Sequence, residues 1–213
     1  MSDGFAAYFA AVDALGRGVA IADGSGRSLP PDAAIDRFVA QARQAHARGN
    51  TLFFIGNGGS AAIASHMAID YSKNGGMRAL ALNDGAALTC LGNDLGYENV
   101  FARQLDLHAR SGDVLIAISS SGRSPNILNA VDTARERGCF ILTLSGFRPD
   151  NPLRTLGDLN LYVASERYGF VEIAHLTLCH AMLDLAVERA AAKPPHGSPA
   201  AVPDAIPTLE TSR

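Results

Sequence analysis

The chain is poor in cysteine, and it has neither a marked excess of one charge nor a long apolar run. Its 213 residues include three cysteines, Cys90, Cys139 and Cys179, which lie far apart in the sequence. An odd number of distant cysteines excludes a disulfide framework and a paired CxxC zinc site. We therefore expect these cysteines to be reduced and to serve as small core residues.

The charge balance excludes another class of function. The net charge is −3, the calculated pI is about 6.0, and the charged residues are scattered rather than gathered in runs. Such a chain has no basic surface for direct binding of nucleic acid. The sequence also lacks an N-terminal basic segment followed by an apolar run, and no apolar stretch approaches the roughly 20 residues that cross a bilayer. We expect a cytoplasmic protein with no membrane contact.

What the chain does have is enough apolar residues, 47%, to bury a core, and its length is typical of one domain. We expect an N-terminal helix and loop over residues 1–31 and the main domain over residues 32–192. From residue 193 to residue 213 the chain is rich in Pro, Ala, Ser and Thr, which predicts a flexible tail.

Short β-prone runs alternate with helical patterns along the main domain. This alternation predicts an α/β fold with a doubly wound parallel sheet flanked by helices, preceded by two N-terminal helices. The predicted strands are residues 51–55, 78–82, 114–118, 140–144 and 159–163. The predicted helices are residues 5–15, 32–48, 60–72, 99–108, 124–137 and 170–191.

The most informative segment is the glycine-rich turn after the first predicted strand of the sheet, Gly56-Asn57-Gly58-Gly59-Ser60. Glycines permit positive φ and a close approach of the backbone to a ligand, and the helix that follows presents its N-terminal amides there. His66 and Asp70 then lie four residues apart on one helical face, a spacing that suits a metal ion or an acid/base pair. The alternative is an ordinary surface ion pair. A sugar phosphate is the first ligand that we expect.

A second anion-binding pattern follows another buried strand. Ser119, Ser120, Ser121 and Ser124 surround a glycine, and Pro125 opens the next helix with Ser124 as its natural N-cap. Hydroxyls and free amides suit a phosphate, although a capped serine-rich loop without a ligand would look the same. In open α/β sheets ligands gather at the carboxyl ends of strands, so two such turns favour a shared site.

With these motifs in order, the sequence resembles the SIS (sugar isomerase) domain family and, within it, the sedoheptulose 7-phosphate isomerases, also called phosphoheptose isomerases. The resemblance covers most of residues 35–190. It rests on the two turns, the helix with His66, the segment Leu91-Gly92-Asn93-Asp94, the segment Gly112-Asp113-Val114-Leu115 and the last helix with His175 and His180. It implies a flavodoxin-like three-layer sandwich and a homo-oligomer, typically a tetramer with active sites between subunits.

The resemblance further implies isomerisation of a ketose phosphate to an aldose phosphate, such as sedoheptulose 7-phosphate to D-glycero-D-manno-heptose 7-phosphate. It assigns phosphate to the four serines and sugar contacts to Asn57, Gly58, Ser60 and Asp94. The acid/base roles align with Asp70 and His180. Family members often carry zinc, and the aligned ligand set here is His66, Asp70, Glu172 and His180.

Two of these positions depart from the family pattern, because Asp70 stands for a glutamate and Glu172 for a glutamine. Asp70 reaches about 1.5 Å less far than a glutamate, and proton abstraction tolerates little displacement. We expect zinc to be kept, with the roles of base and ligand redistributed so that Glu172 or His180 takes over work from Asp70.

Other departures concern the substrate and leave alternatives open. Tyr168 and Gly169 stand where the family has polar residues, and Asn74, beside Lys73, replaces an expected arginine. A different sugar phosphate, a non-catalytic phosphosugar sensor and a binding protein like the DnaA initiator-associating proteins are therefore alternative functions. His175 is more simply a structural core residue, and Cys179 is either buried or a soft ligand.

Overall fold

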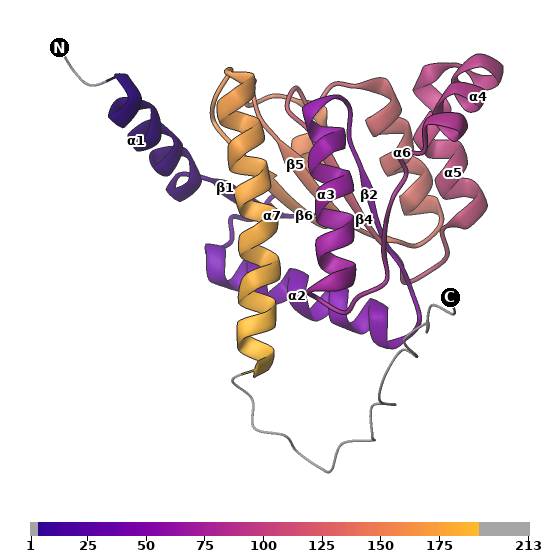
Figure 1. Cartoon of the computed structure of the whole chain (residues 1–213), viewed down its shortest axis with the longest axis horizontal. Helices are drawn as coiled ribbons and strands as arrows, with labels where there is room; N and C mark the ends of the chain where they lie inside the picture. Colours follow the sequence, from indigo (N-terminus) through magenta and orange to yellow (C-terminus); the bar gives the residue numbers. More distant parts are fainter. Residues whose placement is uncertain (1–3, 192–213) are drawn as a thin grey trace, which may run out of the picture.

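The computed structural model describes residues 4–191, which form one six-stranded sheet with helices on both faces (Figure 1). The predicted tail, residues 193–213, lies outside the described residues. The strand order is β1-β6-β5-β4-β2-β3, and every neighbouring pair is parallel except β1 with β6. The predicted α/β class with a doubly wound parallel sheet is confirmed.

The five predicted strands are all present. The central strands are buried runs rich in Leu, Ile, Val, Phe and Ala, as expected for strands covered on both faces, whereas the edge strand at residues 79–81 exposes Leu80. The bounds of the five strands are Leu52–Ile55 (β2), Ala79–Ala81 (β3), Val114–Ser119 (β4), Phe140–Ser145 (β5) and Leu159–Tyr162 (β6).

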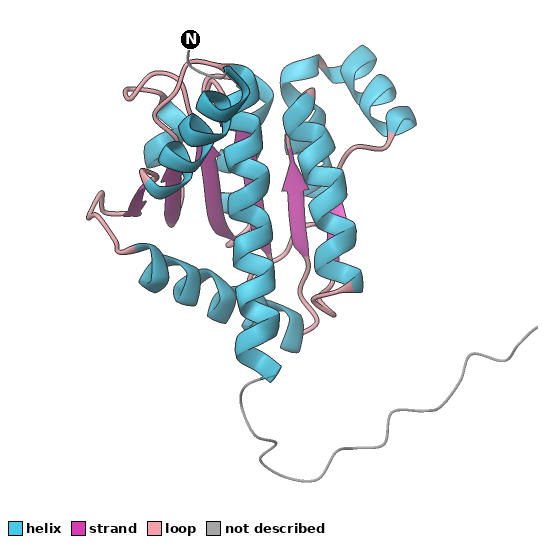
Figure 2. Ribbon diagram, turned by 60° about the vertical axis from the view of Figure 1, so that its left-hand side comes forward, coloured by secondary structure: helices cyan, strands magenta, loops and turns pink. Residues whose placement is uncertain are grey.

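Helices cover each face of the sheet (Figure 2), and each face carries one of the two larger core clusters. One face carries α2 (Pro31–Ala47), α3 (Gly59–Lys73) and α7 (Tyr168–Ala191). The other carries α5 (Val100–His108) and α6 (Pro125–Glu136). The N-terminal helix α1 (Gly4–Arg17) packs against α7 and has no buried residue. Two 3₁₀ turns, η1 (Tyr97–Asn99) and η2 (Pro152–Thr155), complete the elements.

The structure contains two elements that the sequence pattern did not predict. The edge strand β1 (Ala20–Asp23) pairs antiparallel with β6, in a segment whose end was expected to be loop. The helix α4 (Gly85–Leu95) lies in a segment for which no helix was expected. It has no buried residue and projects at one end of the molecule (Figure 1), and its two glycines, Gly85 and Gly92, weaken the helical signal of its sequence.

The expectation that no apolar stretch approaches the length of a membrane span is wrong for α7. Its segment Tyr168–Arg189 is long and apolar enough by length and composition, with a mean hydropathy of 1.5. The physical reason is that α7 is a core helix, which passes the same test, so this is weak evidence of a span. Its buried side chains include Val171, Ala174, Cys179, Met182, Leu183 and Ala186.

Candidate active site

Both ligand-binding turns predicted from the sequence leave the same edge of the sheet. Strands β2 and β4 are parallel neighbours, with Phe54 opposite Ile116 and Ile55 opposite Ala117, so the turns that follow them lie side by side. Gly56 is required at the first turn, because a Cβ there would lie 2.5 Å from the backbone carbon of Ser60. Gly58 adopts a φ of 54°, which glycine reaches without strain.

A cavity of about 260 Å³ lies between these turns and the start of α7. Seven of the residues that the sequence analysis assigned to substrate line it: Asn57, Gly58, Ser60, Ser119, Ser120, Ser121 and Ser124. Gly59, Tyr168 and Glu172 complete the lining. The lining is polar and holds no lysine or arginine among the described residues, so an anion there would be bound by hydroxyls and amides.

The hydroxyl of Ser120 is the clearest indication that this cavity binds a ligand. The residue is 5% exposed and its Oγ atom has no hydrogen-bond partner within the described chain. Buried polar atoms are rarely left unpaired, because an unmade hydrogen bond costs about 1–3 kcal/mol. Neither α3 nor α6 has a side chain capping its first turn, so both helix N-termini offer positive dipole ends near this hydroxyl.

Asn57 has a role that sequence reasoning missed. Its side chain exchanges two hydrogen bonds of 2.9 Å with Asn126, in the first turn of α6, and its Oδ1 also accepts one of 3.0 Å from the hydroxyl of Tyr97. The amide pair joins the glycine turn to the serine turn. A sequence of one chain gives no signal for such a contact, since Asn57 and Asn126 are 69 residues apart.

Glu172 and Tyr168 bring α7 into the cavity. They lie four residues apart, on one face of the helix, and both line the cavity. The carboxylate of Glu172 lies over the start of α3, because a Cβ on Gly59 would be only 2.5 Å from Glu172 Cδ. The cavity therefore holds one carboxylate that can accept a proton beside the hydroxyls that can hold an anion.

A separate group of side chains that could hold a metal ion lies farther along α3 and α7. His66, Asp70 and His180 each offer one ligand atom, and these atoms lie within 4.8 Å of one another. His66 Nε2 is 3.2 Å from His180 Nε2 and 3.4 Å from an oxygen of Asp70. Two imidazoles and a carboxylate fit zinc, which keeps an open coordination position when three protein ligands bind it.

The structure brings together three of the four expected metal ligands and leaves Glu172 apart. Eight residues separate Glu172 from His180, which is about 12 Å along an α-helix. The helices α3 and α7 pack side by side (Figure 1). Residues at their N-terminal ends line the cavity, and the cluster of His66, Asp70 and His180 lies two turns farther along. Asp94 is exposed on α4 and does not line the cavity, and Lys73 lies in the last turn of α3.

His175 and Cys179 are buried residues of the last helix that do not reach the cavity. His175 is fully buried, its Nε2 lies 3.1 Å from the carbonyl oxygen of Ser145, and desolvation lowers its pKa to about 4. Burial raises the pKa of the Cys179 thiol to about 12. A neutral imidazole and a protonated thiol in these places are structural, as expected for His175.

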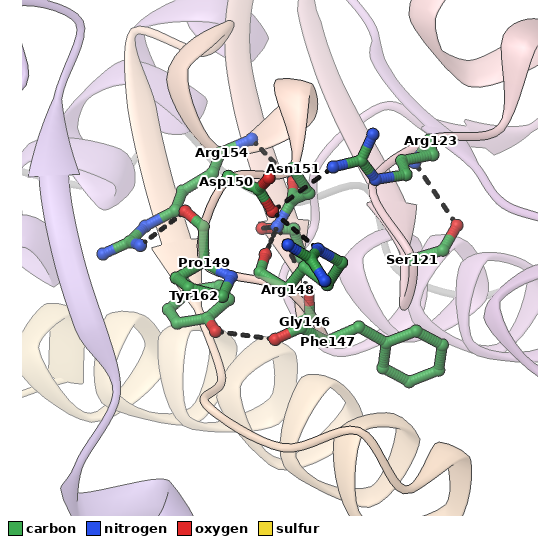
Figure 3. Close-up of polar contacts among 11 residues, drawn as sticks. Ser121, Arg123, Gly146, Phe147, Arg148, Pro149, Asp150, Asn151, Arg154 and Tyr162 are labelled. Carbon is green, nitrogen blue, oxygen red and sulfur yellow. Dashed lines mark hydrogen bonds and ion pairs between the residues drawn. The ribbon is translucent and has the colours of Figure 1, made fainter.

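A third loop, residues 146–151 after β5, is tied to the serine turn. Gly146 N donates to the carbonyl oxygen of Ser120 at 3.0 Å. The carboxylate of Asp150 forms ion pairs with Arg123 at 3.3 Å and with Arg148 at 3.0 Å (Figure 3). Arg123 is therefore turned toward Asp150 and is not part of the cavity lining.

Comparison with known proteins places this site in a family. The model of the SIS domain matches residues 31–146. A phosphoheptose isomerase of Pelobacter propionicus is 42% identical over 170 residues, which span 77% of this chain and 88% of that protein.

Two solved structures agree with this match. The structure of the phosphoheptose isomerase GmhA from Neisseria gonorrhoeae has a TM-score of 0.73 and 31% identity, and the similarity covers 86% of this chain and 98% of that one. A phosphoheptose isomerase from Francisella tularensis also has a TM-score of 0.73, with 25% identity over 87% of this chain and 97% of that one. The chain therefore belongs to the SIS domain family and, within it, groups with the phosphoheptose isomerases.

Proposed function

We propose that this protein is an aldose-ketose isomerase that converts sedoheptulose 7-phosphate to D-glycero-D-manno-heptose 7-phosphate. The proposal draws on relatives named for this activity and on a cavity that combines an anion site with a carboxylate. The reaction moves one proton between adjacent carbons. A base removes a proton from C1 of the ketose and the C2 carbonyl oxygen gains one, which gives an enediol. A proton then returns to C2 while the C1 hydroxyl loses its proton, so that C1 becomes the aldehyde.

In this proposal the phosphate binds between the two turns. The hydroxyls of Ser119, Ser120, Ser121 and Ser124 and the first amides of α3 and α6 bind its oxygens. Gly58 and Ser60 then lie where the sugar chain leaves the phosphate. Asn57 supports this arrangement through Asn126, and Asp94, which is exposed on α4, stays a proposed contact to the sugar hydroxyls.

Glu172 is the residue that we assign as the base. Its carboxylate lies in the cavity, while Asp70 lies with the histidines of the metal cluster. General base catalysis requires hydrogen-bond reach of the proton that is removed, so the residue in the cavity is better placed than Asp70. This assignment redistributes the roles that the family resemblance gave to the first-helix carboxylate.

We further propose that His66, Asp70 and His180 hold zinc. The bound ion would supply a Lewis acid that polarises an oxygen of the substrate. The ring of His180 also lies 3.8 Å from Asp70, so the carboxylate stands beside both imidazoles of this group.

The single observation that carries the functional proposal is the buried, unpartnered hydroxyl of Ser120 in a cavity that also holds Glu172. The test is to incubate the purified protein with sedoheptulose 7-phosphate in heavy water, with zinc and then with a chelator. We expect aldose formation and deuterium entry by NMR, and we expect the chelator to abolish both. Folded protein that binds the ketose but neither converts it nor exchanges its carbon-bound hydrogen would be a sensor instead.

A homo-oligomer, expected to be a tetramer, and a cytoplasmic location belong to the same proposal. Exposed apolar side chains on α1, α3 and α7 support assembly: Phe5, Phe9, Ile69, Ile173 and Val187 are each 38–78% exposed. Three free cysteines are consistent with a reducing compartment. Sedimentation at the assay concentration tests the assembly, and a fully active monomer would exclude a site that depends on it.

A further inference from the structure

Phe147 has a backbone conformation that is unusual for an aromatic residue. Its φ is 56°, and it is the one residue other than glycine with a positive φ in the described part of the chain. A bulky side chain is strained in this left-handed region, and such strain persists only where the surroundings fix it. Strained residues of this kind cluster at ligand-binding sites, so the purpose of this one needs a physical account.

Hydrogen bonds on both sides hold Phe147 in place. Its amide donates a hydrogen bond to the carbonyl oxygen of Ser165 at 2.9 Å. Its own carbonyl oxygen accepts a hydrogen bond of 2.7 Å from the hydroxyl of Tyr162 (Figure 3). The preceding residue, Gly146, leaves no room for a side chain, since a Cβ there would lie 2.7 Å from Val171 Cγ1. The loop is therefore fixed between the serine turn and α7.

This fixed backbone directs the Phe147 ring to Tyr168. The two rings meet edge to face, with centroids 4.7 Å apart and an interplanar angle of 81°. The Phe147 ring also packs on the small core cluster of Val163, Val171 and Ala174, whereas the charged side chains of its loop point elsewhere (Figure 3). Tyr168 is the first residue of α7 and is 63% exposed, so Phe147 is the contact that orients its ring.

Tyr168 differs in kind from every other described residue that lines the cavity. The others are glycines, serines, an asparagine and a glutamate, which can bind a phosphate, hydroxyls or a proton. Tyr168 alone offers a wide apolar face. The carbon chain of a sugar phosphate has C–H faces that pack on such a ring, whereas inorganic phosphate has none.

We propose that Tyr168 is the specificity-determining residue of this cavity and that Phe147 is its positioning residue. The ring contacts the carbon chain of the substrate beyond the phosphate, so that a longer ketose phosphate gains more from it than a shorter one. This inference rests on the proposed function, because it assigns the sugar-phosphate site to the same cavity. It adds a pair of side chains that separates recognition of the sugar from recognition of the phosphate.

The test measures the dissociation constants of sedoheptulose 7-phosphate, fructose 6-phosphate and inorganic phosphate by calorimetry on the full chain. Tyr168→Ala removes the ring, and Phe147→Leu keeps the apolar bulk and the strained φ but removes the aromatic edge. We expect each to lower the preference for the seven-carbon over the six-carbon ketose about tenfold. Affinity for inorganic phosphate should stay within about twofold, because the serine turn is intact. Phe147→Tyr and Tyr168→Phe keep the rings and should keep the preference.

The outcomes separate this inference from the proposed function. An unchanged preference in folded Tyr168→Ala protein would overturn the inference even if the wild type isomerises sedoheptulose 7-phosphate. If the wild type binds both ketoses but does not turn them over, the proposed isomerase activity is overturned. The preference for the seven-carbon over the six-carbon ketose then still tests the role of Tyr168. A parallel loss of affinity for all three ligands in Phe147→Leu would show a merely structural role and would also overturn the inference. No binding of any sugar phosphate by the wild type would overturn both.

Discussion

The carboxylate of Glu172 lies so close over Gly59 that the start of α3 has no room for a side chain. A Cβ on Gly59 would be 2.5 Å from Glu172 Cδ. Because the obstructing atoms are at the end of a flexible side chain, Gly59→Ala displaces the carboxylate rather than the backbone. We expect kcat to fall about 10- to 100-fold, since small displacements of a base are costly. The free energy of unfolding should change by less than about 1 kcal/mol.

Gly85→Ala is the matched control for this substitution. Gly85 is the first residue of α4, as Gly59 is of α3, and no atom lies within 4 Å of its would-be Cβ. It should leave kcat and KM at the wild-type values in the same assay. Full activity of the Gly59→Ala protein would show that the position of Glu172 does not matter for turnover.

Zinc affinity should distinguish the two carboxylates. Asp70→Asn removes a member of the His66, Asp70 and His180 cluster, so we expect its affinity for zinc to fall by more than about 100-fold. Glu172 lies about 12 Å before His180 along α7, so Glu172→Gln should bind zinc as the wild type does. Competition with a chromophoric chelator measures both values on metal-free protein. Turnover should be lost in each variant, and weakened zinc binding in Glu172→Gln would return Glu172 to the ligand set.

Ser120 and Ser145 offer a matched pair of buried hydroxyls. Ser120 Oγ has no partner, whereas Ser145 Oγ accepts a hydrogen bond from Asn151 at 3.4 Å. Ser120→Ala should weaken the binding of inorganic phosphate about tenfold or more, because a hydrogen bond to a charged ligand is lost, without lowering stability. Ser145→Ala should lower the free energy of unfolding by about 1 kcal/mol and leave phosphate affinity unchanged. Titration calorimetry measures the phosphate affinity and urea unfolding measures the stability. If Ser120→Ala lowered the stability and left phosphate affinity unchanged, Ser120 would not belong to the phosphate site.

His175 should make the stability of the protein depend on pH. Burial lowers its pKa from 6.5 to about 4, so on acidification the unfolded chain binds a proton at this residue at a higher pH than the folded chain does. The neutral imidazole contributes about 3 kcal/mol to the free energy of unfolding. This contribution is fully present above pH 6.5 and is lost as the pH falls toward 4. Urea unfolding across this range measures the slope. His175→Gln, which keeps a donor for the carbonyl of Ser145, should have a shallower slope, and equal slopes would contradict the assignment.

The fold could be predicted from the sequence because its central strands are continuous apolar runs bounded by glycines and serines. The strand β4, Val114–Ser119, is wholly buried and has no other plausible structure. The elements that were missed, β1 and α4, are a short edge strand that runs into a glycine-rich turn and a helix that begins with a glycine. A four-residue edge strand and a helix with two glycines carry little periodicity, and their places are set by the rest of the fold.

Some residues of the candidate site could be predicted from the sequence in the same way, and others could not. Its serines and glycines could be predicted, because local turn chemistry shows in the residue types themselves. For Tyr168 the sequence indicated only that polar contacts of the family are lost, and for Asn126 and Tyr97 it indicated no part in the site. Their contacts depend on the register of β2 with β4 and on the packing of α7, which no local pattern encodes. The separation of Glu172 from His180, by contrast, follows from their spacing of eight residues on one helix, which is about 12 Å.

The reciprocal amide bonds between Asn57 and Asn126 bear on the thermodynamics of ligand binding. They fix the glycine turn and the serine turn against each other before any substrate arrives. The conformational entropy of the two turns is therefore lost when the chain folds rather than when phosphate binds, so the site is preorganised. An anion that enters such a rigid cradle meets amides and hydroxyls already aimed at it, which is how a cavity without a single lysine or arginine in its described lining can hold a phosphate.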